Sequence, residues 1–254
     1  MLDAMRLTLL EDLVSVISEA RTEKQLFEAL RSSTRRLGFD HFALSYERTP
    51  ARFDTAGILL HDYPDEWAAV YVGFDLGGAD PIRRACDRSM VGFEWRHLKN
   101  LVPITKGDRQ MLSVGREHGI ADGYTVPRHL PGDASGSCTF VVRPNSLYPG
   151  TMLHVAEAVG AFALTAARRL TGLTSPARKP VLSERQRECL LWSARGKTAG
   201  EIATILGISE ETVVQHLKIA RERYDVHCRQ ALILCALFDG LISFADIFRW
   251  WRQE

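Results

Sequence analysis

The stretch from Leu182 to Val226 constrains this chain more than any other, because its turn chemistry is closely spaced and regular. Residues suited to capping a helix alternate with glycines suited to ending one: Ser183, Gly196, Thr198, Gly207 and Ser209. Between them, apolar residues recur at helical spacing. Three short helices joined by tight turns are typical of a helix-turn-helix fold, whose second helix lies in the DNA major groove.

The order of residues in this stretch is more specific than a generic helix-turn-helix. It contains Trp192, Ala194, Gly196-Lys197-Thr198, Glu201-Ile202-Ala203, Leu206-Gly207-Ile208-Ser209, Thr212-Val213 and His216-Leu217. In this order the residues closely resemble the LuxR/NarL-type DNA-binding domain. The resemblance covers about the last quarter of the chain and implies that the helix after Ser209 reads DNA. A helical bundle that touches no DNA is the structural alternative.

On that helix we expect Val213, Leu217 and Ala220 to face the domain core. Lys218 would reach a guanine edge or a phosphate, and Gln215 an adenine edge. Other polar side chains would bind phosphates, which position the helix without specifying a sequence. The predicted DNA-contacting residues are Lys197, Thr198, Thr212, Val214, Gln215, His216, Lys218 and Arg221.

Two residues depart from the family's pattern. Val214 stands where the family usually has Lys or Arg, so one contact is lost or is replaced by contact with a thymine methyl group. Gln186 stands where the family usually has Glu, which puts in doubt a structural ion pair rather than DNA reading. The DNA site of better-known members therefore does not transfer to this chain.

The chain before this stretch mixes helical and strand patterns. Helices are predicted at 7–17, 22–37, from Pro64, from Pro81, at 106–117 and at 152–170. Strands are predicted at 39–46, 56–60, 124–127 and 137–142. Helices around four or five strands indicate an α+β fold, an α-β-α sandwich of the kind that encloses a small ligand, followed by an all-α four-helix domain.

A second pattern lies in the first region, in the types and separations of six residues: Trp67, Tyr71, Asp80, Pro81, Trp95 and Gly123. In type and in every separation they resemble the signature of the autoinducer-binding domain of LuxR-type quorum-sensing regulators. Tyr63 and Thr139 fit the same pattern. The resemblance spans roughly residues 7–170, so the two signatures together cover nearly the whole chain.

This resemblance implies an N-acyl homoserine lactone as the ligand. Asp80 would accept a hydrogen bond from its amide N–H, and Trp67 would donate to its lactone carbonyl. Tyr63 and Thr139 would donate to the acyl carbonyl. Each of these polar ligand groups needs a partner once it loses water. Flat apolar walls are implied for Tyr71, Pro81 and Trp95.

Taken singly, each of these residues also has a purely structural explanation. Trp67 and Tyr71 fit a core aromatic pair, Asp80-Pro81 a helix cap and Gly123 a strand bend. Their joint spacing favours a ligand site. The residues around the acyl tail are not fixed by any motif, and strand alternation suggests Leu44, Tyr46, Ile58 and Val142.

A segment rich in Pro, Ser and charge, 172–180, predicts a linker between a sensor domain at 1–171 and a DNA-binding domain with a short C-terminal extension at 181–254. The net charge of the chain is only +1, so DNA affinity must come from local clustering and dimerisation. We therefore expect a homodimer on a two-fold DNA site, with 152–170 and 231–241 as candidate interfaces.

Cysteine and histidine usage indicates neither disulfides nor a metal or cofactor site, because the spacing of a ligand set is missing. The sequence lacks a signal-peptide pattern and a membrane-length apolar run, which favours the cytoplasm without a membrane partner. The tail at 244–254 contains Trp250 and Trp251, for which we expect a contact with the sensor domain or a partner protomer.

Other function classes fit less well. A NarL-type response regulator needs alternating strands and helices with an acidic pair after the first strand, whereas this chain opens with two predicted helices. An enzyme using the Trp/Tyr/Asp pocket lacks a catalytic Ser-His-Asp order, a metal cluster and a Gly-rich phosphate loop, so we do not expect an enzyme. A LuxR-type regulator that responds to a non-lactone small molecule is the nearest alternative.

Overall fold

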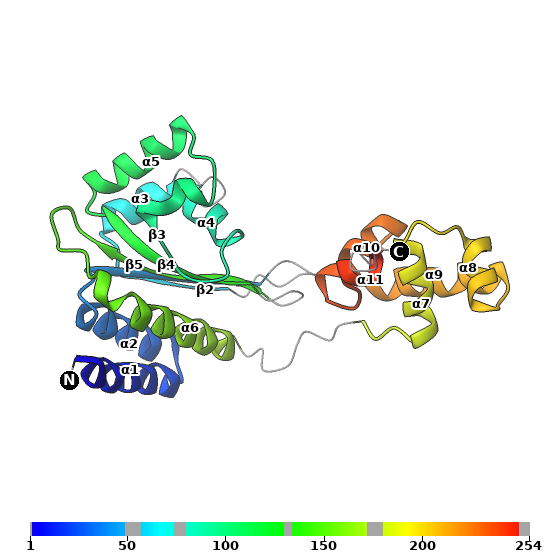
Figure 1. The fold of residues 1–254 in the computed structure, drawn as a ribbon, viewed down its shortest axis with the longest axis horizontal. Coiled ribbons are helices and arrows are strands. Elements are labelled where there is room, and N and C mark those ends of the chain that lie inside the picture. The colour runs from blue at the N-terminus through cyan, green and yellow to red at the C-terminus, as the bar shows by residue number, and fades with distance from the viewer. Residues whose placement is uncertain (1, 49–56, 74–79, 130–133, 172–179, 249–254) are drawn as a thin grey trace. The chain divides into compact units, whose positions relative to one another are not determined.

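The computed structural model describes residues 2–48, 57–73, 80–129, 134–171 and 180–248 (Figure 1). The chain divides into two compact units, of which the first mixes helices with a five-stranded sheet and the second is helical. This confirms the predicted fold class. The predicted linker lies almost entirely outside the described residues, so its bounds stay a prediction.

The sheet of the first unit is antiparallel, with strand order β2-β1-β5-β4-β3. Its strands are β1 (His41–Arg48), β2 (Ile58–His61), β3 (Phe93–Glu94), β4 (Asp122–His129) and β5 (Ala134–Val142). The four predicted strands are present, and the two-residue β3 is an addition that no periodicity could indicate. The register places Ala43 opposite Thr139 and Ser45 opposite Ser137 on the central pair β1 and β5.

Helices cover both faces of this sheet (Figure 1). One face carries α1 (Leu2–Glu19), α2 (Glu23–Arg36) and α6 (Leu153–Leu170). The other face carries α3 (Asp65–Gly73), α4 (Pro81–Cys86) and α5 (Lys106–Glu117), together with the 3-10 helix η2 (Trp95–Asn100). The layer of α1, α2 and α6 packs closely on the sheet, whereas a cavity lies between the sheet and the layer of α3, α4 and α5.

The layer of α1, α2 and α6 forms the main hydrophobic core with the sheet. Phe42, Leu44 and Phe140 are fully buried there, each worth about 1.5–3 kcal/mol of hydrophobic stabilisation. At Gly160 an added Cβ would lie 2.9 Å from Cβ of Val126, so a glycine is required for α6 to approach the sheet this closely. This layer of helices therefore packs closely on the sheet.

Helix starts follow the turn chemistry of the sequence. The Thr22 hydroxyl accepts a hydrogen bond from Gln25 N at 3.2 Å, and the Gln25 side chain accepts one from Arg21 N at 2.8 Å. In a standard capping box this second bond comes from the N–H of the N-cap residue, whereas here it comes from the residue before it. Gly38 ends the second helix with φ +87°, as its position after Leu37 predicts.

The expectation that no run reaches membrane-spanning length needs correction. The segment Gly150–Leu170 is long and apolar enough to cross a membrane by length and composition alone. It comprises the 3-10 helix η3 (Gly150–Met152) and α6, whose buried face packs in the core described above. A core helix passes the same test as a membrane span, so the segment is weak support for a membrane function.

The second unit consists of α7 (Glu184–Ala194), α8 (Ala199–Leu206), α9 (Glu210–Tyr224), α10 (Arg229–Phe238) and α11 (Phe244–Phe248). Ser183, Thr198 and Ser209 cap the first three of these helices as predicted. Gly196 and Gly207 adopt positive φ at +83° and +65°, so the two turns are built as the sequence indicates.

The C-terminal extension is partly explained by α11. Arg195 donates to the backbone carbonyl of Asp246, and Ile247 packs on the core formed by α7, α9 and α10. The described part of the extension therefore belongs to the DNA-binding unit itself. Trp250 and Trp251, for which a contact with the sensor domain or a partner protomer was predicted, lie outside the described residues.

Candidate functional site

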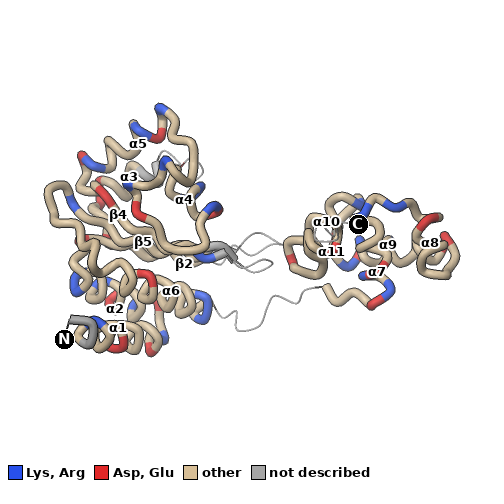
Figure 2. The backbone as a smooth tube through the Cα atoms, in the orientation of Figure 1, with Lys and Arg blue, Asp and Glu red and all other residues tan. Residues whose placement is uncertain are grey.

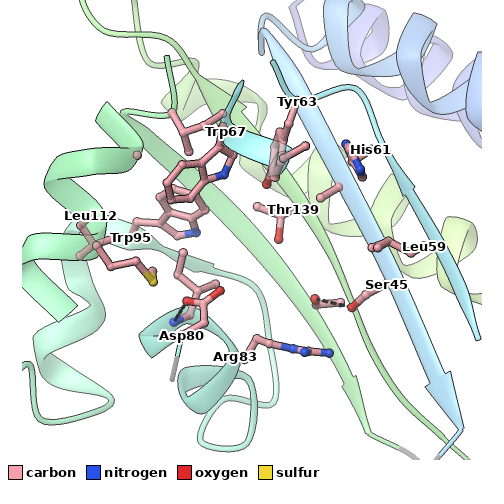
Figure 3. A pocket seen from close by; sticks show the side chains of 17 residues that line it. Ser45, Leu59, His61, Tyr63, Trp67, Asp80, Arg83, Trp95, Leu112 and Thr139 are labelled. Carbon is pink, nitrogen blue, oxygen red and sulfur yellow. Dashed lines mark hydrogen bonds between the residues drawn. The ribbon is translucent and has the colours of Figure 1, made fainter. Parts of the chain in front are cut away.

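A cavity of about 170 Å³ lies between the sheet and the layer of α3, α4 and α5 (Figure 3). Five of the eight predicted ligand residues line it: Tyr63, Trp67, Asp80, Trp95 and Thr139. Residues from β1, β2, β5, α4 and α5 complete the wall, so the cavity is assembled from segments that are distant in the sequence.

Asp80 is the buried carboxylate of this cavity, with 6% of its surface exposed. It is the N-cap of α4, where its Oδ1 accepts a hydrogen bond from Ile82 N at 2.8 Å. Pro81 follows at the first position of that helix, where its missing N–H costs nothing. The cap fixes the direction of the carboxylate, which points into the cavity beside Trp95 (Figure 3).

A chain of hydroxyl groups crosses the sheet beneath the aromatic wall. Trp95 Nε1 donates to the Thr125 hydroxyl at 2.9 Å, and the Thr125 and Thr139 oxygens lie 3.0 Å apart. Either hydroxyl can donate to the other, and when Thr125 donates to Thr139, the Thr139 proton is available to a ligand acceptor. Thr125 is fully buried and was missed in the sequence, where only its position opposite Thr139 could have indicated it.

Trp67 is held rigidly at one side of the cavity. It is 4% exposed and packs with Ile120 and Val141. At Gly115 of α5 an added Cβ would lie 3.3 Å from Cη2 of Trp67, so the helix rests closely on the indole. A tryptophan fixed in this way presents its N–H in one direction, as a selective binding site requires.

Two of the other three predicted residues, Pro81 and Gly123, do not line the cavity. Pro81 serves the start of α4, and the side chain of Tyr71 lies outside the described residues. Gly123 lies on β4 directly against the Trp95 ring, where an added Cβ would be 2.9 Å from Cε2. Its function is therefore to make room for Trp95.

The acyl-tail candidates chosen from strand alternation are wrong. Leu44, Tyr46, Ile58 and Val142 all belong to the hydrophobic core on the opposite face of the sheet. The residues that face the cavity are their strand neighbours, which include Ala43, Ser45 and Leu59. Large apolar residues are suitable contacts for an acyl tail, but on these strands they pack against α1, α2 and α6 in the hydrophobic core.

Outside the cavity, an ion pair joins the two helices above it. Arg84 on α4 donates to Asp108 on α5 with Nη2 2.8 Å from Oδ2, and Thr105 N donates to the same oxygen at 2.7 Å. The hydrogen bond from Arg84, followed by those of Thr105, lowers the pKa of Asp108 to about 2. The pair holds α4, and with it Asp80, in place.

In the second unit, α9 presents part of the predicted DNA-contacting set. Val214, Gln215 and Lys218 are exposed along one side, whereas Val213 and Ala220 are buried as predicted. Arg221 donates to the carbonyl of His227 at 3.2 Å, which gives it a structural partner. Acidic as well as basic residues lie along these helices (Figure 2), so the unit has no strong single-sign charge.

The remaining predicted contacts lie at the starts of α8 and α9. The Thr198 side chain caps α8 and donates to Glu201, which also pairs with Lys197 at 2.8 Å. Hydrogen bonds from Lys197 and Thr198 lower the pKa of the Glu201 carboxyl to about 2. The Thr212 hydroxyl lies 2.8 Å from that of Ser209, and His216 is half-buried on α9.

Gln186 replaces the family's usual glutamate without losing the contact. Its Oε1 accepts from Ser183 N at 2.9 Å and from Arg223 Nη1 at 3.1 Å. Arg223 also donates to the carbonyl of Val181, so it ties α9 to the segment before α7. The ion pair in doubt is thus replaced by a hydrogen bond between an amide and a guanidinium.

A cavity between the sheet and one helical layer of an α-β-α sandwich, joined in one chain to a helix-turn-helix unit, is typical of a ligand-responsive DNA-binding regulator. Family comparisons agree with this class. Residues 22–170 match the model of the autoinducer binding domain, and residues 180–236 match that of the bacterial regulatory proteins of the luxR family. The chain belongs to the LuxR family of quorum-sensing transcriptional regulators.

Individual relatives lead to the same family. The quorum sensing-dependent transcriptional regulator RpaR of Rhodopseudomonas palustris is 30% identical over 188 residues, 72% of this chain and 74% of that protein. The transcriptional activator AhyR of Aeromonas hydrophila is 26% identical over 82% of each chain. The structure of Escherichia coli SdiA shares the fold with a TM-score of 0.66 and 23% identity, covering 95% of this chain and 99% of SdiA.

Proposed function

We propose that this regulator binds an N-acyl homoserine lactone in the cavity around Asp80 and binds promoter DNA as a homodimer in the cytoplasm. The observation that carries the ligand is Asp80 itself. Its carboxylate is 6% exposed beside two tryptophans, one of its oxygens accepts from Ile82 N, and a carboxylate can accept further hydrogen bonds, such as one from an amide N–H. The lactone has one amide N–H, two carbonyl acceptors and an apolar tail, which the cavity can match group by group.

The proposed contacts follow the geometry of the cavity. The Asp80 carboxylate accepts from the amide N–H, and Trp67 Nε1 donates to the lactone carbonyl. The Thr139 hydroxyl, oriented by Thr125, donates to the acyl carbonyl together with Tyr63. Trp95 acts as a flat wall, because its own N–H is already used by Thr125. The remaining residues of the proposed ligand set are Tyr71, Pro81 and Gly123. We assign them to the shape of the site and not to a hydrogen bond with the ligand.

The substitution Asp80→Asn tests this assignment. Asparagine also caps helices well, so α4 should stay folded while the negative charge is lost. We expect lactone binding to weaken at least about tenfold, measured by titration calorimetry, because a hydrogen bond to a charged group contributes roughly 1.5–3 kcal/mol. Asp87→Asn, at the exposed far end of α4, is the matched control. Unchanged lactone affinity in the Asp80 variant would refute the site.

A non-lactone acyl compound is the second candidate ligand. A structure of SdiA in complex with octanoyl-rac-glycerol also resembles this chain, with a TM-score of 0.65 and 23% identity over 95% of this chain and 97% of SdiA. A glycerol hydroxyl can donate to a carboxylate much as an amide N–H does. Mass analysis of the small molecule that co-purifies with the full chain distinguishes the two: a lactone supports the first candidate, another acyl compound the second.

A role as an enzyme has less support in the cavity. Burial raises the pKa of the nearby Cys86 thiol to about 12, so it stays protonated and is a poor nucleophile at neutral pH. We propose a receptor that releases its ligand unchanged. Incubation with lactone followed by mass analysis checks this, and a hydrolysed or acyl-transferred product would contradict it.

For DNA we propose that Val214, Gln215 and Lys218 lie in the major groove, because they form the exposed side of α9. The other members of the set, Lys197, Thr198, Thr212, His216 and Arg221, would bind or orient phosphates. Exposed apolar side chains on α6 (Phe162, 45% exposed) and α10 (Leu234, 66% exposed) support the two candidate dimer interfaces. Sedimentation with and without ligand checks the dimer: a monomer at all concentrations would refute it.

A further inference from the structure

Glu157 on α6 is bonded to the part of the chain that leads to Trp95. Its Oε2 accepts a hydrogen bond from Gly92 N at 2.7 Å and another from the Tyr124 hydroxyl at 2.9 Å. Gly92 directly precedes β3, which is an edge strand of the sheet. Since α6 lies on the face of the sheet opposite the cavity (Figure 1), this carboxylate connects that face with a segment of the cavity side.

The chain that enters β3 has little packing before it meets Glu157. Met90 is 96% exposed and Val91 is 63% exposed. At Gly92, the next residue, an added Cβ would overlap the Glu157 carboxylate and the Tyr124 hydroxyl. The glycine therefore allows the backbone to rest directly on the carboxylate, and this contact fixes where β3 begins.

Beyond this contact, the segment 92–95 forms part of the cavity wall. Phe93 packs with Ile82 of α4, and Ile82 itself lines the cavity. Trp95 lines the cavity too and donates its indole N–H to Thr125. Pairing with β4 holds only the two residues of β3 between them and the contact with Glu157. A displacement of the backbone at the start of this segment would therefore reach Trp95.

The surroundings of Glu157 suit it to hold the segment firmly. Burial, followed by the hydrogen bond to Glu157, raises the pKa of Tyr124, so this hydroxyl stays protonated and donates. Arg128 Nη1 lies 3.5 Å from Oε1, so the two carboxylate oxygens have separate partners. Hydrogen bonds to an ionised acceptor are shorter and stronger than neutral ones, which restricts movement of the Gly92 backbone.

We propose that Glu157 is a positioning residue of the ligand site, which holds Gly92 from α6 and thereby fixes the position of Trp95. Glu157 does not line the cavity, so it acts on a ligand through the segment 92–95. The effect on Trp95 can be measured without a ligand, whereas the effect on affinity rests on the proposed function.

Fluorine NMR of the full chain labelled with 5-fluorotryptophan tests the effect on Trp95, whose resonance is assigned with Trp95→Phe. Glu157→Leu removes the acceptor, and Glu157→Gln keeps an oxygen at the same place. We expect Glu157→Leu to shift the Trp95 resonance and Glu157→Gln to leave it close to its wild-type position. Arg128→Met is the matched control, because it removes the pair at Oε1 and spares both bonds to Oε2.

Calorimetric titration with octanoyl homoserine lactone tests the effect on affinity. Glu157→Leu should bind this lactone about three- to tenfold more weakly than the wild type, because the aromatic wall is no longer held in place. Glu157→Gln and Arg128→Met should stay within about twofold of the wild type. Unchanged affinity in Glu157→Leu, with a wild type that binds, overturns the proposed effect on the ligand.

The remaining outcomes separate positioning from a purely structural contact. A Trp95 resonance that does not move in Glu157→Leu overturns the inference, even where the melting temperature falls. An equal shift in Glu157→Gln or in Arg128→Met also overturns it. If the wild type binds no lactone, the proposed function fails, and the NMR comparison still decides this inference. Gly92→Ala, which forces the backbone away from the carboxylate, replaces Glu157→Leu if that variant does not fold, and should shift the same resonance.

Discussion

Gly123 and Trp95 are in such close contact that a Cβ added at Gly123 would lie 2.9 Å from Cε2 of the indole and 2.9 Å from the backbone oxygen of Phe140. The indole forms part of the cavity wall and the second neighbour is backbone, so neither can move away at a low cost in free energy. The glycine is therefore a condition for the position of Trp95, and through the indole N–H for the orientation of Thr125 and Thr139.

Gly123→Ala should destabilise the sensor unit by about 1–3 kcal/mol and weaken ligand binding, because overpacking displaces the indole. Chemical unfolding and calorimetric titration measure the two effects. Gly107→Ala is the matched control on α5, since its nearest neighbour atom would be 3.8 Å away. An Ala at 123 that leaves both stability and affinity unchanged would show that Trp95 does not depend on this contact.

Thr125→Val should lower ligand affinity although Thr125 is not part of the cavity wall. The variant keeps the side-chain shape but leaves the Trp95 N–H without its acceptor and frees the Thr139 hydroxyl to rotate. We expect a loss of about 1–3 kcal/mol in stability and a measurable rise in the dissociation constant. Thr139→Val, which removes the proposed donor itself, should weaken binding more, and the reverse order would contradict the relay.

Asp108→Asn should destabilise the packing of α4 on α5 by about 1 kcal/mol at neutral pH, because the Arg84 side chain is 38% exposed and solvent screens the pair. The pKa of Asp108 is lowered in the folded chain to about 2, so its contribution is fully present above the unfolded value and is lost as the pH falls from about 4 to 2.

Urea unfolding of the wild type and the Asp108→Asn variant over a pH series checks this dependence. The difference in unfolding free energy should be constant above about pH 5 and shrink below pH 4. Glu117→Gln, at the exposed end of α5, serves as a control and should show no such difference. If the difference in unfolding free energy grew as the pH fell, the predicted direction of the pH dependence would be contradicted.

Gln186→Glu should stabilise the DNA-binding unit by about 0.5–1 kcal/mol. The side chain is 5% exposed, and its oxygen already accepts from Ser183 N and Arg223, so a carboxylate would gain a charge-assisted bond at a prepared site. Differential scanning calorimetry measures the shift. A lower melting temperature would show that desolvation of the carboxylate outweighs the pairing with Arg223.

Val214→Lys should strengthen DNA binding and increase its salt dependence by about one unit in the log–log slope, because a cation on the exposed side of α9 adds one phosphate contact. Fluorescence anisotropy on a duplex selected from a random pool, at several salt concentrations, measures this. Gln230→Lys on α10 adds the same charge outside the proposed DNA face and should leave the slope unchanged. Equal effects of the two variants would place Val214 away from DNA.

The sequence by itself determined the two-part architecture and five of the residues that line the cavity. Caps such as Ser183, Thr198 and Asp80 act within one helical turn, so their chemistry can be read locally and the helices begin where it predicts. Tyr63, Trp67, Asp80, Trp95 and Thr139 meet around one cavity, as their joint spacing indicated.

Only the tertiary structure decided which face of the sheet lines the cavity. Alternation along β1 separates Leu44 from Ser45 but cannot say which of the two faces the helices α1, α2 and α6. The cross-strand pairs Thr125 with Thr139 and Ser45 with Ser137 depend on the register of the strands. These relationships join residues far apart in the sequence, so no local pattern carries them, and they are what orient the donors of the cavity.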